Sequence, residues 1–115
     1  MTIHDLGDGL NGLFALKPTI NFAHFSWDPA PVVDYGVYAE DEESIFRTDN
    51  RHSEKATIAY VNLFTRDDSG FTKDTVEKYF TSLQDDGVTF AWYLNTIQYE
   101  EETKFIHIEW VVEFT

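Results

Sequence analysis

Four histidines and several groups of carboxylates are the residues of this sequence whose types could do chemistry. The histidines are His4, His24, His52 and His107, and no two of them have the spacing of zinc ligands such as His-x3-His. His107 and Glu109 stand two residues apart, which puts them on one face of a strand. Such a pair could share a proton or bind a metal ion. A hydrogen bond across the strands or a solvated face is the commoner use, and we favour that interpretation.

The acidic runs have the composition of cation sites but not the spacing. Glu100-Glu101-Glu102 and Glu40-Asp41-Glu42-Glu43 lack the spaced ligands and the central glycine of a calcium loop. We interpret both as charged, solvated turns. Asp67-Asp68-Ser69-Gly70 begins like a calcium loop, but the remaining ligand positions do not follow, so it is better read as a turn that leads into a helix. The sequence predicts no metal ion and no cofactor.

Motifs of the common enzyme classes do not occur in the sequence. It has no glycine-rich phosphate loop, no Gly-x-Ser-x-Gly and no His-Glu-x-x-His. It also has no cysteine, which excludes a thiol nucleophile, a disulfide and a thiolate metal site. We therefore predict that the chain is not an enzyme and that it has no catalytic residues.

The elements that position these residues are predicted to form one α+β domain over residues 1–115. A body at 20–114 holds strands at 21–27, 35–39, 56–65 and 88–100 and a final strand from Ile106, so that a small, mostly antiparallel sheet ends in a long C-terminal β-hairpin. Residues alternate in character from Ile106 to Phe114, which predicts one buried and one wet face. Strand 56–65 is apolar on both faces and is expected to be central and covered on each side. In strand 88–100, we expect Leu94 on one face and Ile97 and Tyr99 on the other.

Two helices are expected to pack on this sheet. The firm one covers about 72–86, with Thr72 as its N-cap, Gly87 after its end, and an apolar stripe formed by Val76, Tyr79, Phe80 and Leu83. The N-terminal segment 1–18 is predicted to be a weaker or broken helix, because each of its three glycines costs about 1 kcal/mol in a helix interior. Pro18 should end it.

Composition narrows the classes of partner. The net charge of −13 argues against direct binding to nucleic acid or anionic lipid, since both require a basic surface. Acidic surfaces can imitate DNA, or line a passage that must not grip DNA. Ten Phe, six Tyr and three Trp either fill an aromatic-rich core or include some that meet a partner. The sequence shows neither a signal peptide nor a run of 18 apolar residues, which favours the cytosol, or an assembly made there, and no membrane.

An ordered set of segments resembles a known family. The set comprises Tyr35-Gly36-Val37-Tyr38, Thr48-Asp49-Asn50, the strand 59–65, the helix with Val76-Glu77 and Leu83, Tyr99-Glu100-x-Glu102-Thr103, and Ile106-His107-x-Glu109-Trp110. Over about residues 20–114 it resembles the tail terminator, or tail-to-head joining, proteins of long-tailed phages and prophages of Gram-positive bacteria. The resemblance implies a small sheet flanked by helices and no catalytic chemistry.

The resemblance also implies a place and partners. Such a protein forms a ring, usually of six copies, that caps the tail tube in the virion and contacts the tube protein and the head connector, while DNA passes through without specific binding. We expect the interface residues to lie on loops. The residues expected at interfaces are Glu40, Asp41, Glu42, Glu43, Arg47, Asp49, Asn50, Glu101, Glu102 and Lys104. The alternative is an acidic DNA mimic that inhibits a host nuclease or restriction enzyme.

Overall fold

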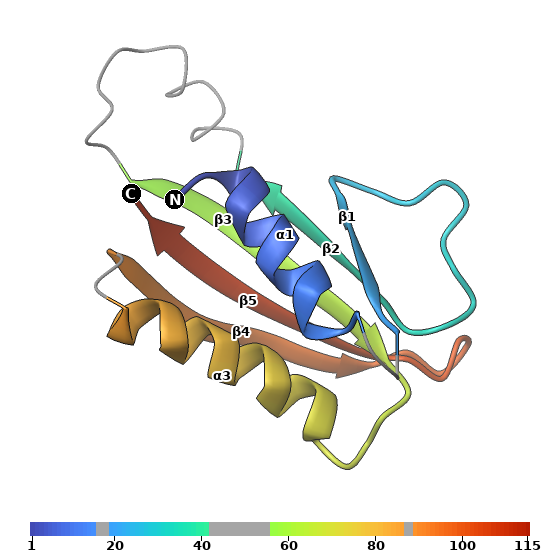
Figure 1. Ribbon diagram of the computed structural model, residues 1–115. Helices are drawn as coiled ribbons and strands as arrows, with labels where there is room; N and C mark the ends of the chain where they lie inside the picture. The colour runs from blue at the N-terminus through green and yellow to red at the C-terminus, as the bar shows by residue number, and fades with distance from the viewer. Residues whose placement is uncertain (16–18, 42–55, 87–88) are drawn as a thin grey trace.

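A five-stranded sheet with two helices on one face is the framework of the fold (Figure 1). The computed structural model describes residues 1–15, 19–41, 56–86 and 89–115. The predicted α+β class and mostly antiparallel sheet are confirmed. The elements in chain order are α1 (Ile3–Leu13), β1 (Asn21–His24), β2 (Tyr35–Glu40), β3 (Thr57–Thr65), α3 (Phe71–Asp85), β4 (Phe90–Tyr99) and β5 (Ile106–Phe114).

The strand order across the sheet is β1-β2-β3-β5-β4. β1 runs parallel to β2, and the other neighbouring pairs are antiparallel. β3 is the central strand and pairs with β5 from Thr57 opposite Phe114 to Thr65 opposite Ile106. β4 and β5 form the predicted C-terminal hairpin. The edges of the described sheet are therefore β1 and β4.

The core lies between the sheet and the helix layer. α1 contacts β1 and β2, and α3 contacts β4. The predicted alternation along β5 is confirmed, since its inward residues are almost fully buried: Ile108, Trp110, Val112 and Phe114. Both helices lie on the same side of the sheet (Figure 1), so the described residues cover only one face of β3, where Ala59, Val61 and Leu63 are inaccessible. The expected cover on its other face is not found among them.

α1 is a regular helix of eleven residues rather than a broken one. It begins with a capping box, in which the Thr2 hydroxyl accepts from the Asp5 N–H and the Asp5 carboxylate accepts from the Thr2 N–H. Two of its three glycines serve close packing: a Cβ on Gly7 would overlap the Tyr38 ring. A Cβ on Gly9 would overlap the Tyr79 ring. Tertiary contact therefore compensates for the low helix propensity that the sequence displays.

α3 begins one residue earlier than predicted, and its cap is a different residue. Gly70 is the N-cap, with φ +89°, a left-handed conformation that suits glycine. The prediction of Thr72 as N-cap is wrong, because Thr72 lies inside the helix. Its N–H and its hydroxyl both donate to the Asp67 carboxylate, at 3.0 and 2.9 Å. α3 ends at Asp85, one residue before the predicted end, and Gly87, predicted to follow the helix, lies outside the described residues.

A β-bulge in β4 changes which of its side chains share a face. The pairing shifts between Leu94 and Thr96, so Leu94 lies opposite Trp110 and Ile97 lies opposite Ile108. Trp110 and Ile108 both point into the core. Leu94, Ile97 and Tyr99 therefore share the helix-covered face, and the prediction that Ile97 and Tyr99 point the other way is wrong.

Candidate interaction surfaces

The tip of the β4–β5 hairpin is an exposed, charged turn. Glu101, Glu102 and Lys104 are all exposed there. The Glu100 N–H donates to the Phe105 carbonyl at 2.8 Å, and the Lys104 N–H donates to the Glu100 carbonyl at 2.8 Å. The expectation that the run at 100–102 forms a turn is thus confirmed. The Thr103 hydroxyl also donates to the Glu100 Oε1 at 3.1 Å, while the side chains of Glu101 and Glu102 remain exposed.

The acidic run that starts at Glu40 is placed differently. Glu40 is the last residue of β2, and its Oε1 lies 2.6 Å from the His24 Nε2, with only 12% of the side chain exposed. The Asp41 N–H donates to the Ile58 carbonyl at 2.9 Å. Glu42, Glu43, Arg47, Asp49 and Asn50 lie outside the described residues. Glu40 sits at the end of the sheet opposite to the hairpin tip, so the structure does not bring these two groups of predicted residues together.

The His107 and Glu109 pair is used for hydrogen bonds between strands, as we favoured from the sequence. The His107 Nε2 lies 2.7 Å from the Asn62 Oδ1, and the Asn95 Nδ2 donates to the Glu109 Oε1 at 2.7 Å. His107 also stacks on Phe64, with ring centroids 4.2 Å apart. Within the described ranges, no group of three or more His, Cys, Asp or Glu is arranged to hold a metal ion.

Arg66 ties the hairpin to the loop between β1 and β2, a role that the sequence did not reveal. Its Nη2 donates to the Thr103 carbonyl at 2.9 Å, and its Nη1 donates to the Val32 carbonyl at 2.6 Å. The guanidinium lies 3.9 Å from the centroid of the buried Phe105 ring. The sequence shows only that this arginine follows a predicted strand directly, and that position does not identify its hydrogen-bond partners.

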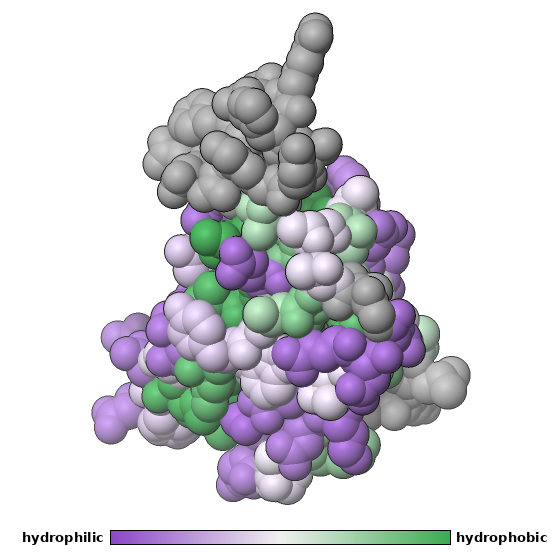
Figure 2. Space-filling view, turned by 90° about the vertical axis from the view of Figure 1, so that its left-hand side faces the viewer, coloured by the Kyte–Doolittle hydropathy of each residue, from purple (hydrophilic) through white to green (hydrophobic). Residues whose placement is uncertain are grey.

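Apart from Tyr60 on β3, the exposed large apolar side chains of the described residues fall into two separate groups. The loop surface belongs to the connection between β1 and β2 and comprises Phe25, Trp27, Val32 and Val33. The β4 surface lies along the opposite edge of the sheet; it comprises Phe71 of α3 and four residues of β4, of which Leu94, Ile97 and Tyr99 lie on the helix-covered face and Tyr93 on the other face. Five of these nine side chains are at least 58% exposed: Val32, Val33, Phe71, Tyr93 and Tyr99. Figure 2, which views the end where the termini lie, also shows hydrophobic patches between hydrophilic ones.

The two edges of the sheet differ in how they are protected. β1 has four residues, and the Asn11 side chain caps it: the Asn11 Nδ2 donates to the Phe22 carbonyl at 3.1 Å, and the Phe22 N–H donates to the Asn11 Oδ1 at 2.7 Å. β4 has ten residues, and no side chain among the described residues caps its outer edge. Within the described residues, β4 therefore offers the longer row of backbone groups that no side chain occupies.

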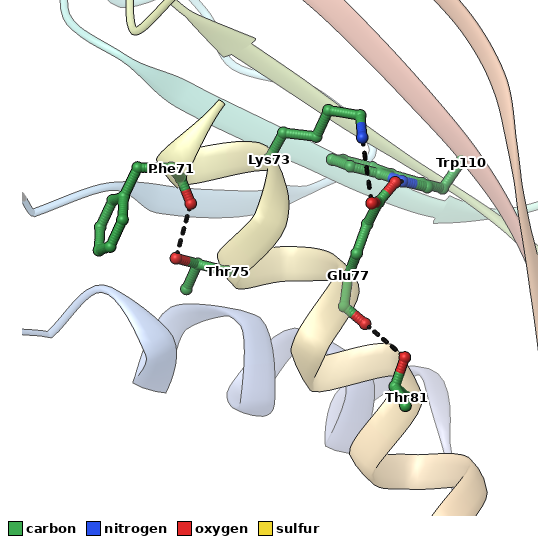
Figure 3. A network of polar contacts seen from close by, with 6 residues as sticks. All are labelled: Phe71, Lys73, Thr75, Glu77, Thr81 and Trp110. Carbon is green, nitrogen blue, oxygen red and sulfur yellow. Dashed lines mark hydrogen bonds and ion pairs between the residues drawn. The ribbon is translucent and has the colours of Figure 1, made fainter. Parts of the chain in front are cut away.

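A groove lies between α3 and β4. It has a volume of about 460 Å³ and is lined by Trp92 and by one face of α3: Asp74, Glu77, Lys78, Thr81, Ser82 and Asp85. Figure 3 shows how Glu77 is held, with its carboxylate accepting from the buried Trp110 Nε1 at 2.9 Å and from the Lys73 Nζ at 3.0 Å. The side chains of Asp74 and Asp85 make no hydrogen bond or ion pair within the part of the chain that the structure describes. The charged lining therefore consists of three carboxylates and one lysine, Lys78, which gives a net negative groove beside Trp92.

Neither described helix has the length and the apolar character that crossing a membrane requires. No protein-family model matches the chain. A search of curated proteins finds no match either.

Proposed function

We propose that this chain is a structural subunit of a phage tail, a tail terminator or head-to-tail joining protein. Copies of the chain form a ring on the finished tail tube, with six copies as the resemblance implies. The ring stops further addition of tube protein and offers a surface to the head connector. The ordered resemblance from Tyr35 to Trp110 is the starting point of this proposal.

The structural observation that supports it is the pair of apolar surfaces at opposite sides of one small subunit. A monomeric protein rarely exposes large contiguous apolar patches, and such patches commonly mark sites of association. A ring subunit meets two neighbours through unlike patches and meets the tube and connector through others. The loop surface, the β4 surface and the charged hairpin tip supply several separate contact regions.

Addition of the purified chain to growing tubes of its phage's major tail protein tests the proposal. Electron microscopy should show tubes capped at one end, and their growth should stop. Val33→Asp places a charge in the loop surface and should weaken capping, whereas Ala30→Asp adds the same charge to a small exposed residue of the same loop and should not. Tubes that grow unhindered and bind no chain would refute the proposal.

The net charge of −13 supports one alternative function, that of a DNA mimic that blocks a nuclease or restriction enzyme. A mimic should compete with DNA for a basic enzyme in a binding assay, and a tail subunit should not.

Within the proposed ring, the acidic residues could instead face the central passage. They would then repel the DNA phosphates and prevent the DNA from binding to the wall. Replacing those acids with lysine should then slow DNA ejection, and unchanged ejection would exclude this role.

A further inference from the structure

We infer that the free edge of β4 accepts an extended, basic segment of another protein, which pairs with β4 as a sixth strand. The inference goes beyond the proposed function, because it names the chemistry of a partner at one surface. It rests on β4 and α3 alone and does not require that the chain forms a ring.

β4 has the composition of a strand that is paired on both sides. Residues 87–99 contain no Asp, Glu, Lys or Arg, and this is the longest such run in a chain with 29 charged residues, eight basic and 21 acidic. Edge strands of monomeric proteins are commonly short, or carry charges or proline that prevent pairing. β4 is ten residues long and has none of these devices along its sequence. Its large side chains Tyr93, Leu94 and Ile97 remain exposed.

The bulge limits the pairing to one half of β4. Asn95 is the extra residue between the paired positions Leu94 and Thr96, and its side chain is held by Glu109. Bulges bend an edge and interrupt a ladder. The uninterrupted run is therefore Phe90–Leu94, where five residues pair with β5 in register. Trp92 of this run forms the floor of the groove beside α3.

The carboxylates of α3 beside Phe90–Leu94 favour a basic segment as the added strand. Asp74 and Asp85 are eleven residues apart on α3, which corresponds to about 16 Å along a helix. Side chains four residues apart on one face of an added strand are about 13 Å apart, within reach of two long basic side chains. A residue between them lies over Trp92, where an arginine or lysine gains cation–π attraction. Side chains on the other face of the added strand would contact Tyr93 and Ala91, which favours apolar residues there.

A second copy of this chain is a poor occupant of the same edge. Its own β4 carries no basic residue, and each copy has a net charge of −13, so two copies repel each other. Its other edge, β1, is short and already capped by Asn11. The segment therefore comes from a different protein, with basic residues at positions i and i+4 and apolar residues on the alternate face.

A synthetic peptide tests the inference with the full chain. The probe has nine residues and blocked ends, in the order threonine, valine, arginine, valine, threonine, valine, arginine, valine, threonine. Its control has the same residues with one arginine moved by one position, so that the two arginines point to opposite faces. Fluorescence anisotropy should show that the first peptide binds at least about five-fold more tightly than the control, because only it matches both carboxylates.

Matched variants of the chain locate the binding. Asp74→Asn with Asp85→Asn should weaken binding of the probe about five-fold. Glu101→Gln with Glu102→Gln removes the same charge from the exposed hairpin tip and should leave the affinity within two-fold of the unmodified chain. Hydrogen exchange should show new protection of amides within Phe90–Leu94 when the probe binds.

Four results would overturn the inference. The first is no binding of the probe, and the second is equal binding of the two peptides. The third is an equal effect of the two double variants, which would indicate attraction by net charge alone. The fourth is a chain that, without peptide, sediments at twice its mass of 13.4 kDa with β4 already protected, which would assign the edge to a second copy.

Discussion

At the scale of single residues, Asp67 does the most to start α3, although it stands four residues before the helix. Its carboxylate accepts hydrogen bonds from the N–H and the hydroxyl of Ser69 and from the N–H and the hydroxyl of Thr72. The Ser69 hydroxyl bond, followed by the bonds to Thr72 and the Ser69 N–H, holds the pKa of Asp67 well below its usual range. The turn and the first turn of α3 therefore depend on one charged group.

Asp67→Asn should lower the free energy of unfolding at neutral pH by about 1 kcal/mol. Because the folded-state pKa lies below the usual value of about 3.9, the carboxylate stabilises the fold above that value. Its contribution is lost as the pH falls towards the folded-state pKa. Urea denaturation at neutral and acidic pH measures both effects. Asp68→Asn, on an exposed neighbour, is the control, and an equal loss from both variants would contradict this role.

Glu77 satisfies the only polar atom of the fully buried Trp110 side chain. Glu77→Ala leaves this N–H without an acceptor and should destabilise the protein by about 1–3 kcal/mol. Glu77→Gln keeps an amide oxygen as acceptor and should cost less, although it weakens the pair with Lys73. Thermal unfolding of both variants distinguishes the two cases. A loss as large for glutamine as for alanine would show that the charge, not the hydrogen bond, matters.

At the scale of elements, the glycines of α1 set how closely this helix approaches its neighbours. Gly7→Ala should destabilise the fold by about 1–3 kcal/mol, because the new Cβ overlaps the buried Tyr38 ring. Gly12→Ala meets no atom within 4 Å and should stabilise it by about 0.5 kcal/mol through helix propensity. Chemical denaturation of the two variants provides the measurement. Stabilisation by both substitutions would mean that α1 does not pack on Tyr38.

The elements also show what sequence patterns can and cannot predict. The period-two pattern of β5 and the apolar stripe of α3 are local, so both elements were predicted within a residue or two. The regularity of α1 depends on Tyr38 and Tyr79, which are distant in sequence and invisible to propensity. The bulge in β4 reverses the face of Ile97 without a change in composition, so alternation alone could not detect it.

The candidate surfaces were less predictable than the fold. Acidic composition identified the hairpin tip as exposed, but it also suggested a solvated turn at Glu40, whose carboxylate is instead bound by His24. The β4 surface was missed because the sequence does not show that this uncharged strand lies at an edge, which only the strand order reveals. Position in the sheet is a property of the whole topology, and no local pattern reports it.

At the scale of the whole molecule, charge opposes every contact between copies. Each chain carries 21 acidic and eight basic residues, so bringing copies together concentrates negative charge. If the proposed ring forms, its assembly should strengthen as salt rises from about 0.05 M to 0.5 M, because screening shortens the range of repulsion. Sedimentation velocity across this range measures the effect. Assembly that weakens with salt would show that ion pairs, rather than apolar contacts, hold the copies together.

The small amide of Asn11 has a consequence for how far strand pairing can extend. It pairs with the outward N–H and carbonyl of Phe22, so these two backbone groups cannot bind another strand at the β1 edge. A strand can add at β4, whereas at the other edge of the described sheet the Phe22 backbone groups are already paired, which hinders growth from that side. Addition at one edge is therefore expected to end rather than propagate, which disfavours open-ended fibres built through the edges of the described sheet.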